Sequence, residues 1–243
     1  MNGASSGEKS GVRSLMDGFN ERVHAYIPAK YYHYLKEYFG ERGKRAFLHA
    51  VQYYGAQRGR RMAQRAIRDG VELTQENYNY YGEWINTEEI KREGIENRAE
   101  LTPDGVMKIS SCPWYTQFQD MNSREAGALY CKDLDASISR GFNPFLGYEV
   151  EKTLHEGEYC IHHLRSGNIG EGAKRGKNPE SLRPFAYHCA HIYYAFKEVT
   201  EAIFLREGVK VSEKVLEDFQ KDYGEEMTDA IVKYRNVNFN VCD

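Results

Sequence analysis

A cysteine and an acid share one predicted helix. At 100° steps, the apolar face of residues 124–142 collects a set of residues that includes one charge: Gly127, Cys131, Leu134, Asp135, Ile138 and Phe142. Asp135 follows Cys131 by one turn, and side chains at that spacing meet. A buried carboxylate is costly without a partner. We therefore expect Asp135 either to hydrogen-bond a backbone group or tyrosine, or to line a pocket beside Cys131 and bind or deprotonate a ligand.

A second cysteine lies on a predicted strand. The alternation of residues 159–165 puts Cys160, His162 and Leu164 on one face. Side chains two residues apart on a strand are about 7 Å apart, which is too far for a hydrogen bond but close enough to share a pocket. A cysteine becomes a nucleophile when a base or cation lowers its thiol pKa, and His162 is the nearest candidate. The alternative is an ordinary packed cysteine.

Local breaks define the elements that carry these residues. Asn143 and Pro144 end the helix, because proline cannot continue it and restrains the residue before it. The alternation over 146–154 then predicts a half-buried strand, and 155–158 a turn. Upstream, Pro-Asp-Gly at 103–105 predicts a turn before a strand over 106–110, which ends at Cys112-Pro113. Trp114 then forms either core or a pocket wall.

These landmarks occur in an order that resembles the L-2-amino-thiazoline-4-carboxylic acid hydrolase family. They are Cys112-Pro113 after a strand, Cys131 on a helix, Asn143-Pro144, Thr153-Leu154, and Gly157 before Cys160. The resemblance covers roughly residues 40–165. It implies an activity that opens a cyclic amidine, with cysteines implicated in the chemistry.

The flanking regions are predicted to be largely helical. Residues 12 to about 100 read as helices, with a break at Pro28 and the longest helix over 45–69. Gly55, Gly59 and Ala63 form a small-residue stripe that favours close helix packing. The same helix carries arginines at 58, 60, 61, 65 and 68, a pattern typical of a solvated face. The alternative is that one of them, Arg58, turns inward to bind a substrate carboxylate.

The C-terminal part begins with a polar loop and continues as helices. Residues 166–180 have almost no apolar side chains and form a possible lid, whose Lys174, Arg175 and Lys177 would attract an anionic ligand. A helix from Ser181 to Arg206 has a regular apolar stripe that buries Cys189. His188 could reach the pocket as an acid or base, but His191 points away from Cys189, which argues against a metal site there.

Composition narrows the class of protein. A net charge of −3 in 243 residues gives no general attraction to nucleic acid or anionic membrane, and no apolar run approaches the ~20 residues of a membrane helix. Five cysteines without a CxxC pair favour reduced thiols in the cytoplasm. We expect a disordered tail over 1–11, a single domain over 12–243, no cofactor, a small-molecule partner and a possible homo-oligomer.

The predicted fold is α+β, with a helical N-terminal half, a small mostly antiparallel sheet and C-terminal helices packed on it. The leading hypothesis is a cysteine-dependent hydrolase acting on a C–N bond of a small cyclic amidine or amide. Its catalytic candidates are Cys131, Cys160, Asp135 and His162, and its substrate-binding candidates are Cys112, Trp114, Asn143, His188 and Arg58. Two alternatives are a non-catalytic binding module, and a metal-dependent hydrolase with Cys131, Cys160, His162 and His188 as ligands.

Overall fold

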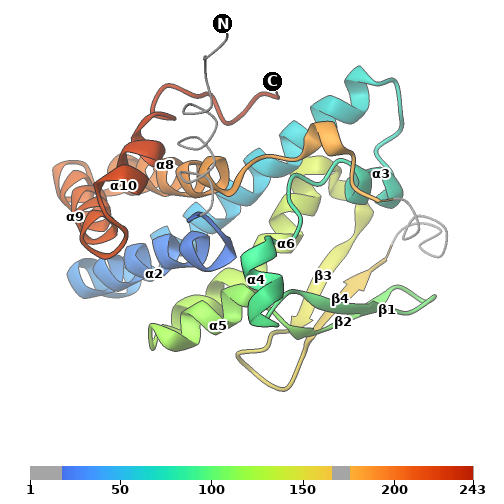
Figure 1. Cartoon of the computed structure of the whole chain (residues 1–243), viewed down its shortest axis with the longest axis horizontal. Coiled ribbons are helices and arrows are strands. Elements are labelled where there is room, and N and C mark those ends of the chain that lie inside the picture. The colour runs from blue at the N-terminus through green and yellow to red at the C-terminus, as the bar shows by residue number, and fades with distance from the viewer. Residues whose placement is uncertain (1–17, 166–175, 243) are drawn as a thin grey trace, which may run out of the picture.

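Helix α2 (Glu21–Arg68) runs the length of the molecule in the computed structural model, which describes residues 18–165 and 176–242 (Figure 1). The predicted break at Pro28 is wrong, because the proline lies inside the helix. Its missing hydrogen bond is offset by packing of the buried neighbours Tyr26, Ile27 and Tyr31. The helix kinks instead at Gly40, whose φ of 54° and ψ of −127° are not helical.

Helix α6 (Arg124–Phe142) has the bounds expected from its apolar stripe and packs directly on α2. The predicted small-residue contact is confirmed. A Cβ on Gly59 would lie 2.0 Å from the Ile138 carbonyl oxygen, and one on Gly55 would lie 2.7 Å from the Cβ of Ser137. The two backbones therefore approach closely only because these positions lack side chains. This contact fixes the helix that carries Cys131 and Asp135.

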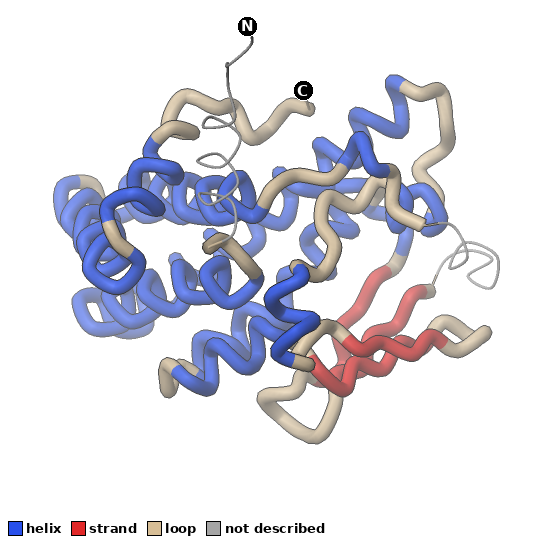
Figure 2. The backbone as a smooth tube through the Cα atoms, viewed as in Figure 1, coloured by secondary structure: helices blue, strands red, loops and turns tan. Residues whose placement is uncertain are grey.

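Four antiparallel strands form a sheet at one side of the helical body, drawn in red in Figure 2. Their order is β1-β2-β4-β3, with β1 (Arg98–Leu101), β2 (Val106–Ser111), β3 (Tyr148–Lys152) and β4 (Cys160–Leu164). The expected strands β2, β3 and β4 are confirmed, whereas β1 falls where helix was expected. Cys160, His162 and Leu164 all face inward, as their alternation predicted.

The C-terminal helices cover the face of α2 beside α6. Helix α8 (Phe185–Phe204) packs on α2 and is followed by α9 (Arg206–Tyr223) and α10 (Glu225–Val232). The expected N-cap at Ser181 is wrong, because Pro184 occupies the cap of α8. Gly224, at φ 89°, separates α9 from α10.

Short elements complete the described chain. They are α3 (Gln75–Tyr80), α4 (Glu88–Glu93), α5 (Pro113–Asp120), and the 3-10 turns η1 (Pro144–Leu146) and η2 (Pro179–Ser181). The arrangement is α+β, as predicted. The expected tail over 1–11 lies outside the described residues, as does most of the possible lid over 166–180. In the part of the chain that is described, no helix combines the length and apolarity needed to span a bilayer.

Candidate active site

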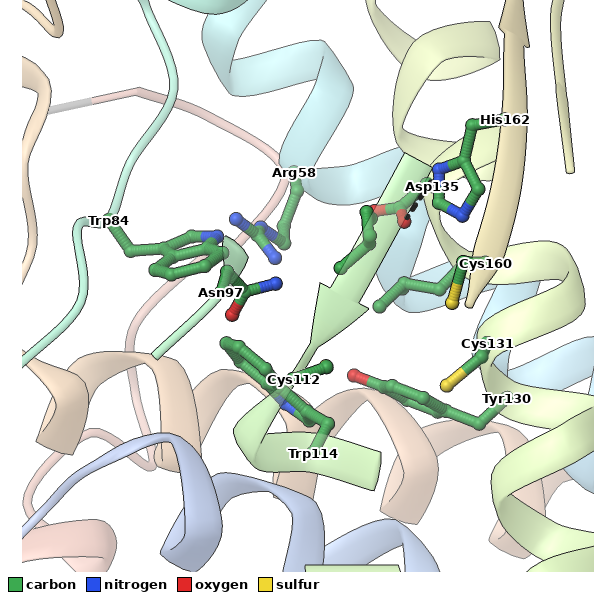
Figure 3. A pocket seen from close by; sticks show the side chains of 12 residues that line it. Arg58, Trp84, Asn97, Cys112, Trp114, Tyr130, Cys131, Asp135, Cys160 and His162 are labelled. Carbon is green, nitrogen blue, oxygen red and sulfur yellow. Dashed lines mark ion pairs between the residues drawn. The ribbon is translucent and has the colours of Figure 1, made fainter. Parts of the chain in front are cut away.

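A cavity lies where α6, the inner face of the sheet and α2 meet (Figure 3). Its inner hollow has a volume of about 80 Å³. Seven of the candidates chosen from the sequence line it, contributed by four segments of the chain: Arg58, Cys112, Trp114, Cys131, Asp135, Cys160 and His162. The prediction that Cys131 and Cys160 share a hollow with Asp135 is therefore confirmed as geometry.

Three thiols surround this hollow, and burial governs their ionisation. Burial raises the pKa of Cys112 to about 12 and that of Cys160 to about 11. It also raises the pKa of Cys131 well above the ordinary thiol value, with smaller contributions from Cys112, Cys160 and Asp135. All three groups are consequently neutral thiols at pH 7, and a base must remove a proton before any of them attacks a substrate.

The nearest base to a sulfur is a histidine that the sequence did not single out. Nε2 of His155 lies 3.8 Å from Sγ of Cys131, and Nδ1 of the same ring lies 3.3 Å from the side-chain nitrogen of Gln119. Residues 155–158 were expected to serve only as a turn. The sequence feature that accompanies His155 is Gly127, one turn before Cys131 on the same helix. The structure gives its reason, because a Cβ at this position would lie 2.4 Å from Nε2 of His155.

Asp135 lies opposite His162 at the mouth of the hollow. Its Oδ2 is 3.8 Å from Nδ1 of His162, which is also 2.7 Å from the hydroxyl of Tyr148. Burial lowers the pKa of His162, while the charge of Asp135 opposes that effect. The Asp135 side chain is 40% exposed, so its carboxylate faces the cavity rather than the protein interior. It is positioned to meet a cationic group of a ligand.

A buried group of arginines lies beside the cavity, and Arg58 lines it. Arg58, Arg61 and Arg65 are each at most 5% exposed, so the expected solvated face is wrong for these three. They surround one carboxylate, that of Glu83, which accepts hydrogen bonds of 2.9 and 2.7 Å from Arg61 and 2.8 Å from Arg65. Nε of Arg58 lies 3.7 Å from the same group.

The carboxylate of Glu83 stays ionised among these guanidinium groups. Burial opposes its ionisation, but the charges of Arg61 and Arg58 and the hydrogen bonds from Arg61 hold its pKa at about 2. Arg58 makes no hydrogen bond within residues 18–165 and 176–242, and its guanidinium points into the cavity (Figure 3). It can receive a carboxylate.

An outer hollow of about 430 Å³ adjoins the inner one and shares Arg58, Trp84, Asn97, Ile109 and Asp135 with it. It adds Tyr78, Tyr148 and Lys177. Lys177 as a whole residue is exposed, but its ammonium group lies in the outer hollow beside Gly82, where burial of that group and the charge of Arg58 lower its pKa to about 8. Of the three loop cations noted in the sequence, Lys177 thus lines the cavity, whereas Lys174 and Arg175 lie outside the described residues.

Three other candidates have structural contacts. Trp114 lines the inner hollow but donates its indole N–H to Nδ1 of His24 at 2.9 Å. Asn143 lies away from the cavity lining, where it caps η1 and donates to the Leu73 carbonyl. His188 donates from Nε2 to the Glu83 carbonyl at 3.1 Å and lies outside the lining of both hollows. Burial, with a contribution from Arg58, lowers its pKa to about 3.

The proposed set of soft metal ligands does not converge. His188 lies outside the lining of the inner hollow, where its Nε2 is bonded to the Glu83 carbonyl. Over the described ranges, 18–165 and 176–242, no three His, Cys, Asp or Glu side chains gather closely enough to bind one metal ion. The metal-dependent alternative therefore gains no support from the geometry.

The cavity has thiols and a carboxylate at one end and the Arg58 guanidinium at the other. The family model of L-2-amino-thiazoline-4-carboxylic acid hydrolase matches residues 20–162, which include every lining residue of the inner hollow. The chain belongs to this family, and the membership indicates a hydrolase. No curated protein and no solved structure matches the chain.

Proposed function

We propose that this protein is a cysteine-dependent hydrolase that opens a C–N bond in a small cyclic amidine or amide bearing a carboxylate. The observation that carries the proposal is the placement of Cys131 and Asp135 opposite the Arg58 guanidinium in one cavity. A bound substrate would direct its carboxylate to Arg58 and its amidine to Asp135. Its electrophilic carbon would then face the Cys131 sulfur. The family membership is consistent with this chemistry.

The proposed reaction uses Cys131 as the nucleophile. As its thiol loses a proton to a neighbouring base, sulfur forms a bond to the amidine carbon and the ring nitrogen takes up a proton. The carbon–nitrogen ring bond then breaks and its electron pair leaves with the nitrogen as an amine. Water adds to the carbon, the carbon–sulfur bond breaks, and the thiol is restored. The sum is addition of one water molecule across the ring bond.

Asp135 would favour this reaction through charge. An amidinium is more electrophilic than a neutral amidine, and a carboxylate beside it stabilises the positive form. Asp135 also raises the pKa of Cys131, so its charge is useful only when a substrate cation is present to balance it. Binding of the correct substrate would thus remove the electrostatic penalty on thiolate formation.

A panel of small heterocycles tests the proposed function. Cyclic amidines and amides, each with and without a ring carboxylate, are incubated with the protein, and ring opening is followed by mass spectrometry. We expect turnover of a carboxylated cyclic amidine, with kcat/KM at least about tenfold higher than for its uncharged analogue, the typical difference for a lost charged hydrogen bond. Thermal stabilisation by these compounds without any product would instead support the non-catalytic binding module.

Lys177 predicts how substrate affinity depends on pH. Its pKa of about 8 means that the ammonium loses its charge as the pH rises through that value. If Lys177 assists Arg58 in binding the carboxylate, KM should rise above pH 8, by up to about tenfold per pH unit. The variant Lys177→Arg stays charged and should keep KM constant from pH 7 to 9. If KM depends on pH in the same way for the two proteins, Lys177 does not assist in binding the carboxylate.

A further inference from the structure

We propose that His155 is the general base for Cys131 and that Gln119 and Gly127 position its ring. This inference rests on the proposed function, but it assigns a role to a histidine that lies outside the lining of the cavity. Among the described histidines, His155 has a ring nitrogen within hydrogen-bonding range of a cavity thiol. The arrangement of thiol, imidazole and amide is the one that a thiol nucleophile requires.

The surroundings fix the His155 ring behind Cys131. The ring contacts Tyr115 and Phe118 edge-on, with centroid distances of 5.0 and 6.0 Å. The side chains of α6 leave space for it only because residue 127 is glycine, since a Cβ there would lie 2.3 Å from Cε1 of the ring. Arg124 donates two hydrogen bonds, of 3.0 and 2.6 Å, to the His155 carbonyl and holds the backbone.

Gln119 can form a hydrogen bond with either neutral tautomer of the His155 ring. With its amide nitrogen toward Nδ1, as observed, the ring carries its proton on Nε2 and faces sulfur with a donor. A half-turn of the amide presents the carbonyl oxygen, which accepts from Nδ1–H and leaves Nε2 free to accept the thiol proton. The base form and the form that stabilises a thiolate are thus both available.

The charges around His155 favour its neutral form. Burial and the charge of Arg124 lower its pKa to about 4, while Glu156 acts weakly in the opposite direction. The remaining groups that face the ring are Cys131, Tyr115 and Gln119. The imidazole is therefore unprotonated at pH 7 and able to accept a proton as the carbon–sulfur bond forms. It would return that proton to the departing ring nitrogen.

His162, the base expected from the sequence, is placed for a different task. Its Nδ1 is engaged by the Tyr148 hydroxyl and faces Asp135, and no hydrogen bond to a sulfur is found for it in the described residues. It orients the carboxylate that would bind the amidinium. The two histidines therefore act on opposite sides of the reacting carbon. His155 accepts the proton of the Cys131 nucleophile, and His162 orients the Asp135 carboxylate that binds the cationic group of the substrate.

The test compares His155→Gln, His162→Gln and His163→Gln over a range of pH. His155→Gln should lower kcat/KM at pH 7 by about 10²–10⁴-fold, and this deficit should shrink as the pH rises, because hydroxide then ionises the thiol without a base. His162→Gln should reduce activity by a factor that is constant above pH 7. His163 lies on the outer face of β4 beside Glu151, so its variant is the matched control and should retain activity.

Two further variants protect the test against misfolding. Gly127→Ala keeps every catalytic group but displaces the His155 ring, so it should reproduce the pH-dependent deficit. Gln119→Glu places a carboxylate on Nδ1, which raises the His155 pKa and should shift the acid limb of the profile to higher pH. A pH-independent loss in these variants would overturn the role of His155. Full activity in His155→Gln while Cys131→Ser is inactive would do the same. In both cases the proposed function would still stand. Activity in Cys131→Ser would instead refute the proposed function.

Discussion

Replacing Cys131 with serine should reduce kcat for ring opening by at least about 10³-fold, the scale of loss when a covalent nucleophile is removed. Serine differs from cysteine by one atom, so packing against α2 and the sheet should persist. An alcohol is a weaker acid and a weaker nucleophile than a thiol, so His155 would activate it much less effectively. Stopped assays of wild type and variant at equal concentration measure the effect, and circular dichroism verifies that the variant is folded.

Cys160→Ser and Cys112→Ser are the matched controls. The Cys160 sulfur accepts a hydrogen bond from the Leu154 backbone N–H at 3.2 Å and is 6% exposed, so it is tied into the sheet. Cys112 precedes Pro113 at the start of α5 and has no histidine partner in the described ranges. We expect both variants to keep at least about a tenth of the wild-type kcat, equivalent to a loss within ~1.4 kcal/mol. Loss of activity in Cys160→Ser but not in Cys131→Ser would identify Cys160 as the nucleophile.

Replacing Glu83 with glutamine should lower the free energy of unfolding by about 3–5 kcal/mol, the usual cost of leaving buried charges without their partner. Arg61 and Arg65 are at most 2% exposed and would lose their shared counter-charge. The amide can accept a hydrogen bond but cannot neutralise a guanidinium. Urea unfolding followed by fluorescence measures the difference.

Glu93→Gln provides the comparison on the surface. Glu93 lies 3.4 Å from Arg22 and is 46% exposed, so its replacement should cost no more than ~1 kcal/mol.

The contribution of Glu83 to stability depends on pH with a definite sign. The Glu83 pKa of about 2 lies below the ordinary 4.5, so its contribution is complete above pH 4.5 and is lost as the pH falls toward 2. An equal effect of both variants would show that the buried network contributes little.

Local sequence patterns were sufficient to predict the helix and the strand that carry Cys131 and Cys160. Helix α6 could be placed because its apolar stripe repeats at the helical period and proline ends it. The inward face of β4 followed from simple alternation, which put Cys160 and His162 on the same side. Both inferences depend on residues within a few positions of one another, and the structure confirms them.

The remaining parts of the site depend on partners distant in the sequence. Arginines spaced along a helix resemble a solvated face until Glu83, on a loop 22 residues after Arg61, is placed among them. His155 looked like a turn residue because its partners, Gln119 and Cys131, lie 36 and 24 residues away. Strand β1 has no apolar alternation, since three of its four residues are exposed and only pairing with β2 defines it.

Trapping the covalent intermediate is the most direct test of Cys131 as the nucleophile. Protein mixed with a slowly hydrolysed cyclic amidine is quenched in acid within milliseconds to seconds and digested with trypsin. Because a ring opened at one bond remains in one piece, we predict a mass gain equal to the whole substrate on peptide 125–132, which contains Cys131. An adduct on peptide 153–165, which contains Cys160, would contradict the account. So would turnover without any adduct if the Cys131→Ser variant is also active.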